Sequence, residues 1–244
     1  MLTFTHSLKT PNESQLIIFD WDGTLFDSTA AIAHSLSRAV HELGLGEVSE
    51  HQARQVIGLG FAEATQALVG EVSATTLNAF VAKYRQYYFA DEHALVLFEG
   101  ILPLLQTLKM HNKYLAVATG KSRMGLNRLL NIHPEISRLF DSTRTADETA
   151  SKPHPLMLQE LLDEHNMDAE QAIMVGDTQF DIEMARAIHM KNIAVTYGAH
   201  SVDDLLRVQP DVVVHDVAQL TQCLLPTFVG NSKAAAHTLL ALSA

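Results

Sequence analysis

Two carboxylates separated by a single residue mark the part of the sequence best suited to chemistry. Asp20 and Asp22 follow the apolar run 16–19, and Gly23 comes directly after them. Along an extended backbone, side chains at positions i and i+2 lie on the same face, so the two acids are expected to be neighbours. Like charges at that spacing raise each other's pKa unless a cation lies between them. The stretch therefore predicts the floor of an active site.

Three other polar residues are expected at the same edge of a sheet. Thr119 closes the strand-like run 114–119, Asp177 follows the apolar run 172–176, and Lys152 stands in a loop just before a helix. In an open parallel sheet, ligands bind beyond the carboxyl ends of the strands. An isolated acid after a strand is commonly a turn former or helix cap. Occurring together and in order, these residues predict one site.

The elements that position these residues follow an alternating pattern. Strand-like runs alternate with helical periodicity outside 28–92, which predicts an α/β fold with a parallel sheet covered on both faces. Residues 28–92 have helical patterns only, one of them running from Ser49 to about Ile57, and predict an inserted helical module. We expect a core of residues 1–27 and 93–225, a cap of residues 28–92, and a C-terminal tail of residues 226–244. Later strands are expected at 193–197 and 212–215, and a loop from 131 to 151.

Composition excludes several classes of protein. The chain has 244 residues and a formal net charge of −11, which argues against a nucleic-acid or anionic-membrane surface. Cys223 is the only cysteine, so an intramolecular disulfide is impossible and a reducing compartment is expected. The first 14 residues lack the apolar region of a signal peptide. No apolar run reaches the roughly 18 residues of a membrane span. A cytoplasmic location is therefore expected.

Four short motifs resemble those of the haloacid dehalogenase superfamily, in the same order, over about residues 15–220. They are Asp20-Trp21-Asp22-Gly23-Thr24-Leu25, Ala118-Thr119-Gly120-Lys121, Ser151-Lys152-Pro153 and Gly176-Asp177-Thr178-Gln179-Phe180-Asp181. The helical insert after the first motif is similar to the small cap of the phosphoglycolate-phosphatase-like branch. The resemblance implies a Rossmann-like core, a mobile cap, Mg²⁺, and hydrolysis of a small phosphorylated metabolite through an aspartyl phosphate.

The resemblance also implies a role for each motif residue. Asp20 would be the nucleophile, and Asp22 would exchange protons with the leaving group and with water. Side chains of Asp20 and Asp177, with the backbone carbonyl of Asp22, would hold the metal. An acid cluster with one lysine and only oxygen ligands favours Mg²⁺ over zinc on chemical grounds. The residues expected to offset phosphoryl charge are Lys152, Thr119 and the amide of Gly120. Asp181 is expected either to support the site or to be a plain helix N-terminal acid.

The predicted cap contains two features that could bear on the substrate. Gly58 and Gly60 interrupt the helical pattern, and backbone amides at the start of the next helix could meet a substrate anion. The alternative is that these glycines only end one helix and begin another. Tyr84, Tyr87 and Tyr88 are expected to pack within the cap rather than to form a stacking surface.

Alternatives remain open at the level of the sequence. A β-phosphoglucomutase-like phosphotransferase would have Arg and Ser after the cap glycine, where this chain has Phe61 and Ala62. An inorganic pyrophosphatase of the same superfamily is a further alternative. Outside it, a receiver-like signalling domain would be about half this length and lack a cap, and a catalytically silent binding protein would not need every motif residue. Neither the natural substrate nor the choice between monomer and dimer follows from the sequence.

Overall fold

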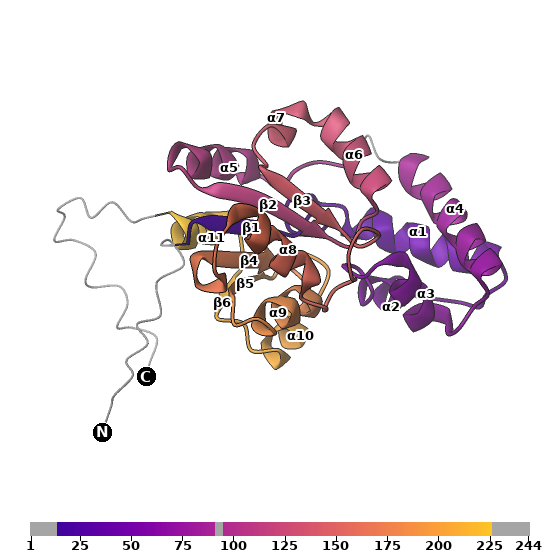
Figure 1. The fold of residues 1–244 in the computed structure, drawn as a ribbon. Coiled ribbons are helices and arrows are strands. Elements are labelled where there is room, and N and C mark those ends of the chain that lie inside the picture. Colours follow the sequence, from indigo (N-terminus) through magenta and orange to yellow (C-terminus); the bar gives the residue numbers. More distant parts are fainter. Residues whose placement is uncertain (1–13, 91–94, 226–244) are drawn as a thin grey trace, which may run out of the picture.

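A six-stranded parallel sheet forms the centre of the computed structural model, which describes residues 14–90 and 95–225 (Figure 1). The strand order is β3-β2-β1-β4-β5-β6, so the first strand lies in the middle. The strands are β1 (Leu16–Phe19), β2 (Tyr114–Thr119), β3 (Ser142–Thr145), β4 (Ala172–Gly176), β5 (Lys191–Val195) and β6 (Val212–Val214). The predicted α/β parallel-sheet fold is confirmed.

Helices cover both faces of this sheet. They are α1 (Thr29–Glu42), α2 (Glu50–Arg54), α3 (Phe61–Val69), α4 (Ala74–Ala90), α5 (Ile101–Met110), α6 (Arg123–Ile132), α7 (Pro134–Ser137), α8 (Leu156–His165), α9 (Gln179–Arg186), α10 (Val202–Arg207) and α11 (Val217–Leu224), with a short 3-10 turn at Ala169–Gln171. Alternate residues of β1 enter different apolar clusters because successive strand side chains point to opposite faces. Ile17 and Phe19 pack in the cluster that contains residues of α5, α6 and α11. Leu16 and Ile18 pack with α8 and α9.

The strand register sets the position of the acids. Phe19 lies beside Val117 of β2 and Val175 of β4, so the residues that follow β1 and β4 leave the sheet side by side. The Asp20 amide donates a hydrogen bond to the Val175 carbonyl oxygen at 2.9 Å, which extends this pairing one residue past β1. The central location of β1 therefore delivers Asp20 to the middle of the carboxyl edge.

Helices α1 to α4 form a group at one end of the molecule, next to that edge (Figure 1). The chain enters and leaves this group through two adjacent segments. Phe26 and Leu97 form an antiparallel bridge, the Asp27 amide donates to Val96 O at 3.0 Å, and the Phe98 amide donates to Leu25 O at 3.0 Å. We refer to residues 25–27 with 96–98 as the neck. The predicted helical content of this insert is confirmed, while its division from the core as a separate domain stays a prediction.

Several sequence-based boundaries were wrong, among them the ends of β5 and β6, which stop at Val195 and Val214 rather than at 197 and 215. The expected loop 131–151 contains α7 and the edge strand β3, whose sequence Ser-Thr-Arg-Thr lacks an apolar pattern. Strand β5 begins at Lys191 rather than Ile193, because Asn192 and Asp211 exchange hydrogen bonds of 3.0 Å that satisfy polar groups at the strand start. The second helix stops at Arg54 rather than near Ile57, although a capping box between Ser49 and Gln52 stabilises its start.

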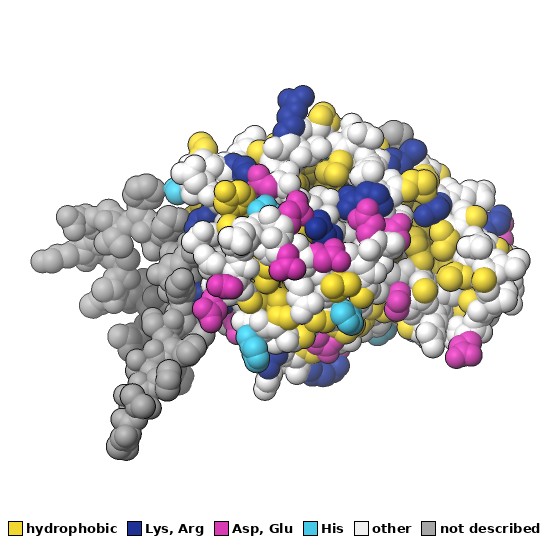
Figure 2. Space-filling view, viewed as in Figure 1, with side chains coloured by type: hydrophobic (Ala, Val, Ile, Leu, Met, Phe, Trp, Pro, Cys, Tyr) yellow, Lys and Arg dark blue, Asp and Glu magenta, His cyan; other side chains and the backbone are white. Residues whose placement is uncertain are grey.

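The distribution of charge on the surface does not by itself locate a site. Acidic and basic side chains are interspersed over the face in Figure 2. Among the described residues, no helix is both long enough and apolar enough to cross a bilayer. The predicted C-terminal tail, 226–244, lies outside the described residues.

Candidate active site

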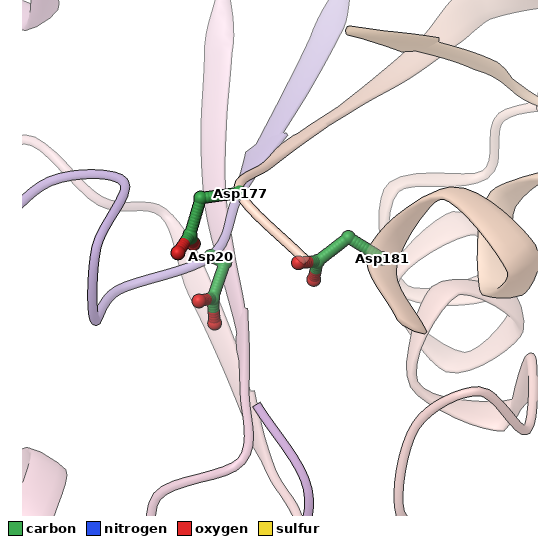
Figure 3. A group of neighbouring side chains, drawn as sticks. All are labelled: Asp20, Asp177 and Asp181. Atoms are coloured by element: carbon green, nitrogen blue, oxygen red, sulfur yellow. The ribbon is translucent and has the colours of Figure 1, made fainter. Parts of the chain in front are cut away.

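Three buried aspartates converge at the carboxyl edge of the sheet (Figure 3). Asp20 follows β1, Asp177 follows β4, and Asp181 lies in the first turn of α9. One carboxylate oxygen from each lies within 4.8 Å of the others. The structure thus brings together three of the four acids that the sequence singled out, and the fourth, Asp22, lies in the adjoining loop.

Lys152 is the cation of this cluster. Its Nζ lies 2.7 Å from Asp20 Oδ1 and 2.6 Å from Asp181 Oδ1, and all three side chains are buried. These contacts raise the Lys152 pKa despite its burial, so the ammonium is retained. The predicted lysine is therefore at the acids, and Asp181 contacts it directly rather than serving only as a helix N-terminal acid.

One lysine does not balance three carboxylates. Burial, opposed mainly by Lys152, raises the pKa of Asp20 to about 7, and burial raises that of Asp177 well above its usual range. Asp20 Oδ2 is buried and has no hydrogen-bond partner among the described residues. An unpartnered carboxylate oxygen beside two other acids is a suitable environment for a hard divalent cation with oxygen ligands. The donor set fits such an ion.

The Asp177 carboxylate is held rigidly. Oδ1 accepts a hydrogen bond from Thr24 Oγ1 at 2.8 Å, and Oδ2 accepts one from the Ala199 amide at 2.6 Å. A Cβ at either Gly23 or Gly198 would collide with this carboxylate. Gly23 also has φ +82°, a left-handed conformation that favours glycine. The glycine of the first motif is therefore required both by the turn and by the close approach of Asp177.

Asp22 faces a different set of partners from Asp20. Ser28 Oγ donates to Asp22 Oδ1 at 2.6 Å, and Lys121 Nζ lies 3.0 Å from Asp22 Oδ2. Lys121 Nζ also donates to the Tyr88 hydroxyl at 2.9 Å. No role was predicted for Lys121. Its position immediately after Gly120 at the edge of the site was the signal available for it.

Thr119 and Gly120 form the next wall of the site. Thr119 is buried, and its Oγ1 accepts a hydrogen bond from the Lys121 amide at 3.2 Å, which leaves the hydroxyl proton available to a ligand. A Cβ at Gly120 would collide with the Gly58 carbonyl oxygen and would lie 2.7 Å from the Leu59 carbonyl oxygen. The loop between α2 and α3 therefore lies directly on the loop after β2.

Gly58 and Gly60 take part in this contact. Gly58 has φ +98°, and the Gly60 amide donates a hydrogen bond to Ser151 Oγ at 2.8 Å, next to Lys152. That amide, expected to be available to a substrate anion, thus has a protein partner in this arrangement. Substrate contact by these two glycines stays a prediction.

We expect Gly120→Ala to lower kcat/KM for 4-nitrophenyl phosphate by about 10²-fold. The added Cβ would push backbone against backbone, and displacements near 1 Å in an active site have effects of this size. Gly125→Ala is the matched control, because its Cβ would lie at an ordinary 3.4 Å from Ser122 Oγ. Released phosphate and a thermal melt measure activity and folding. Equal activity in the two variants would show that the close approach has no catalytic consequence.

A cavity lies between the acids and helices α1 to α4. Its lining includes Asp20, Asp22, Thr119, Gly120 and Gly58. Tyr84 and Tyr88 also line it, with ring centroids 5.4 Å apart and planes inclined by 14°. Tyr84 and Tyr88 are buried in the hydrophobic core, in agreement with the expected packing, and they border the cavity as well. The sequence showed their helical spacing, but not that this helix face borders the site.

The fold and the site together indicate the class of protein. The fold is Rossmann-like, and buried acids and a lysine lie at the carboxyl edge of its sheet. Residues 17–195 match the family model of haloacid dehalogenase-like hydrolases, so the chain belongs to that family. Among curated proteins, it is 31% identical over 219 residues to a phosphoglycolate phosphatase of Aliivibrio fischeri, covering 86% of this chain and 96% of that one. It is 34% identical over 234 residues to the Dickeya dadantii protein named "Probable phosphatase IndB", covering 93% and 96%.

A solved structure agrees with this assignment. The crystal structure of a predicted phosphoglycolate phosphatase from Haemophilus somnus is 25% identical, with a TM-score of 0.75, and the match covers 86% of this chain and 97% of that one. The predicted superfamily and the predicted phosphatase class of enzyme are thereby confirmed. A divalent metal is typical of this class, and the buried acid cluster is consistent with it.

Proposed function

We propose that this protein is a Mg²⁺-dependent phosphatase that hydrolyses a small phosphomonoester through an aspartyl phosphate on Asp20. The observation that supports the proposal is the hydrogen bonding of the Asp20 carboxylate, which lies at the end of the central strand. Lys152 contacts one of its oxygens, and the other has no hydrogen-bond partner among the described residues. A carboxylate in a water-poor site with its two oxygens in different environments can hold an ion with one and attack phosphorus with the other.

Asp20, Asp177 and the backbone carbonyl of Asp22 would hold the ion, and Asp181 would act through Lys152. When bound, Mg²⁺ would neutralise charge on the phosphoryl oxygens. Zinc sites typically include cysteine or histidine ligands, and this cluster contains only carboxylates. That donor set is the reason for proposing magnesium.

In the first half-reaction, an Asp20 oxygen attacks phosphorus and the ester P–O bond breaks. Asp22 gives its proton to the departing alkoxide, so the alcohol leaves neutral. The Lys152 ammonium, the Thr119 hydroxyl and the Gly120 amide bind the phosphoryl oxygens and offset their charge. In the second half-reaction, water attacks the same phosphorus and loses a proton to Asp22. The acyl P–O bond then breaks, which releases inorganic phosphate and restores the Asp20 carboxylate.

In this proposal, the insert 28–92, which we take as the cap, selects the substrate. Its helices supply no acid to the cluster of Asp20, Asp177 and Asp181, but they supply much of the cavity wall. The relatives named phosphoglycolate phosphatase make a small phosphorylated acid the first substrate to test. Phosphate release from a panel of phosphorylated metabolites with Mg²⁺ tests the function. Failure on all of them, and on 4-nitrophenyl phosphate, would reject it.

We expect Asp22→Asn to reduce steady-state turnover by at least ~10²-fold, the lower range for loss of a general acid or base. The deficit should be largest for an alkyl phosphate, whose alkoxide needs a proton to leave. With 4-nitrophenyl phosphate, the leaving group departs without that proton, while hydrolysis of the acyl phosphate remains slow. Stopped-flow absorbance should therefore show a burst of up to one nitrophenolate per enzyme. Equal loss on both esters without a burst would contradict the proton-transfer role of Asp22.

A further inference from the structure

Lysines lie at both chemical ends of the site. Lys152 contacts Asp20, the proposed nucleophile, and Lys121 contacts Asp22, the proposed proton donor. In phosphoryl transfer, the attacking and leaving oxygens lie roughly in line on either side of phosphorus. A cation beside the proton donor is therefore on the side from which the leaving group departs. Lys152 binds phosphoryl oxygens in the proposed reaction, which leaves the charge of Lys121 without a use.

Lys121 is held in place from both the core and the insert. Its amide donates to Thr119 Oγ1 at 3.2 Å, directly after β2, and its side chain is only 8% exposed. Its Nζ lies 3.0 Å from Asp22 Oδ2 and donates to the hydroxyl of Tyr88, a residue of α4, at 2.9 Å. Lys121, Asp22 and Tyr88 all line the cavity. The ammonium is therefore fixed at the boundary between the strand-end acids and the helical wall.

The Lys121 ammonium has a donor to spare. An ammonium has three N–H donors and no acceptor. At most two of those of Lys121 are engaged, by the Tyr88 hydroxyl and by Asp22 Oδ2, and within the described part of the chain no other acceptor contacts Nζ. A general acid works within about 3 Å of the atom that it protonates. An ester oxygen at that distance from Asp22 Oδ2 can also lie within hydrogen-bond distance of Nζ, because the two atoms are 3.0 Å apart.

The charge of Lys121 is uncompensated at the step in which the leaving group departs. Asp22 must be protonated to serve as the acid, and in that form it is neutral. Lys121 then has no other acid partner among residues 14–90 and 95–225. Much of the cavity wall is apolar, which weakens screening of its charge; the lining includes Ile32, Leu36, Val56, Ile57 and Phe89. Once its proton has moved, Asp22 is a carboxylate and becomes the counter-ion of Lys121.

Resting on the phosphatase function proposed above, we propose that Lys121 donates a hydrogen bond to the bridging ester oxygen and stabilises the charge that develops there as the P–O bond breaks. The electron pair of that bond goes to the leaving oxygen, Asp22 supplies the proton, and Lys121 keeps all three of its own. Lys121 is thus a catalytic residue of the first half-reaction alone, because the alcohol has left when water attacks the acyl phosphate. Asp22, in contrast, serves both half-reactions.

Esters with graded leaving groups test this role. The measurement is kcat/KM for phosphate release with Mg²⁺ from 4-nitrophenyl, phenyl and ethyl phosphate, whose leaving groups become more basic in that order. We expect Lys121→Met to lower kcat/KM for ethyl phosphate by at least ~10-fold, the size of a hydrogen bond to a charged group. The loss should be smaller for phenyl phosphate and smallest for 4-nitrophenyl phosphate, whose leaving oxygen carries the least charge.

Pre-steady-state kinetics separate direct action of Lys121 from action through Asp22. If Lys121 served only to hold Asp22, its loss would also slow hydrolysis of the acyl phosphate. Lys121→Met would then show the nitrophenolate burst expected of Asp22→Asn. We expect instead no burst beyond that of wild type, and steady-state turnover of 4-nitrophenyl phosphate close to that of wild type.

Lys83→Met is the matched control. Lys83 is a residue of α4 whose Nζ lies 3.0 Å from Glu42, and it is outside the cavity lining. Its substitution makes the same change of side chain and charge and should leave all three kcat/KM values unchanged. Lys121→Gln is a second variant of the test residue, because it replaces the ammonium with a neutral donor. Its loss should also rise with the basicity of the leaving group, and a thermal melt establishes folding of each variant.

The two proposals fail in different ways. No hydrolysis of any of the three esters by wild type would overturn the phosphatase function and this inference with it. Hydrolysis by wild type, with an equal loss or no loss on the three esters in Lys121→Met, would overturn the role of Lys121 alone. A burst like that of Asp22→Asn, or the same pattern of losses in Lys83→Met, would also overturn it. If Lys121→Met does not fold, Lys121→Gln decides by the same criteria.

Discussion

Asp20→Asn is expected to lose at least ~10⁴-fold in turnover, since an amide cannot form the acyl phosphate and loss of a nucleophile has effects of that order or larger. The variant should still bind phosphate. It should also fold, because Lys152 keeps its second contact with Asp181 at 2.6 Å. Phosphate release measured with and without the substitution, together with a thermal melt, separates lost chemistry from lost structure.

Asp163→Asn provides the control for Asp20→Asn. Asp163 is an exposed residue of α8, so its substitution makes the same change of charge away from the cluster. A second readout is direct: rapid acid quenching of wild type with a ³²P-labelled ester should trap label on the protein, and Asp20→Asn should trap none. Near-normal turnover by Asp20→Asn would show that the reaction does not proceed through this carboxylate.

Removal of divalent metal is expected to abolish activity, and added Mg²⁺ to restore it. Three buried carboxylates with one lysine leave charge that a cation must offset before an anionic phosphate can enter. Ca²⁺ should inhibit, because it prefers more ligands and a looser geometry than Mg²⁺. Full activity in excess chelator, with no tightly held metal by elemental analysis, would overturn the metal requirement.

Asp177→Asn tests whether the required metal is bound at this site. We expect the Mg²⁺ concentration for half-maximal activity to rise by at least ~10-fold, since an amide offers a weaker oxygen ligand and no charge. Asp211→Asn is not a suitable control, because Asp211 joins β5 to its neighbour through Asn192. Asp163→Asn serves again, and its Mg²⁺ dependence should match wild type.

Apolar strands were the most predictable part of the fold. β2 was predicted with its observed bounds because all its interior residues are apolar and Gly120 follows it. β3 was missed because its four residues are polar and it is stabilised by pairing with β2 at the sheet edge rather than by its own pattern. The start of β5 was missed because Asn192 looks like a loop residue until Asp211 is seen beside it. The presence of β3 and the start of β5 both depend on partners that are distant in the sequence, so the local residues did not reveal them.

The convergence of Asp20 and Asp177 could be predicted because parallel strands end at a common edge, and Lys152, in a loop just before a helix, was the cation expected at that edge. The positions of the groups that surround them could not be predicted. Lys121 reaches Asp22 across a turn, and Tyr88 reaches Lys121 from a helix that the sequence connects to the core only through the neck. Their roles depend on how the helical group is oriented on the sheet. Side chains at strand ends were therefore predictable, and side chains supplied by the insert were not.

The neck has a consequence for how this protein could change its specificity. Its two segments are joined by a bridge between Phe26 and Leu97 and by backbone hydrogen bonds on either side, so the insert begins and ends at adjacent points. A replacement insert with a different length or number of helices would need only to join the core at those two points. The register of β1 with β2 and β4 would not change. Exchange of whole inserts at the neck is therefore a practical route to new substrates on an unchanged set of strand-end aspartates.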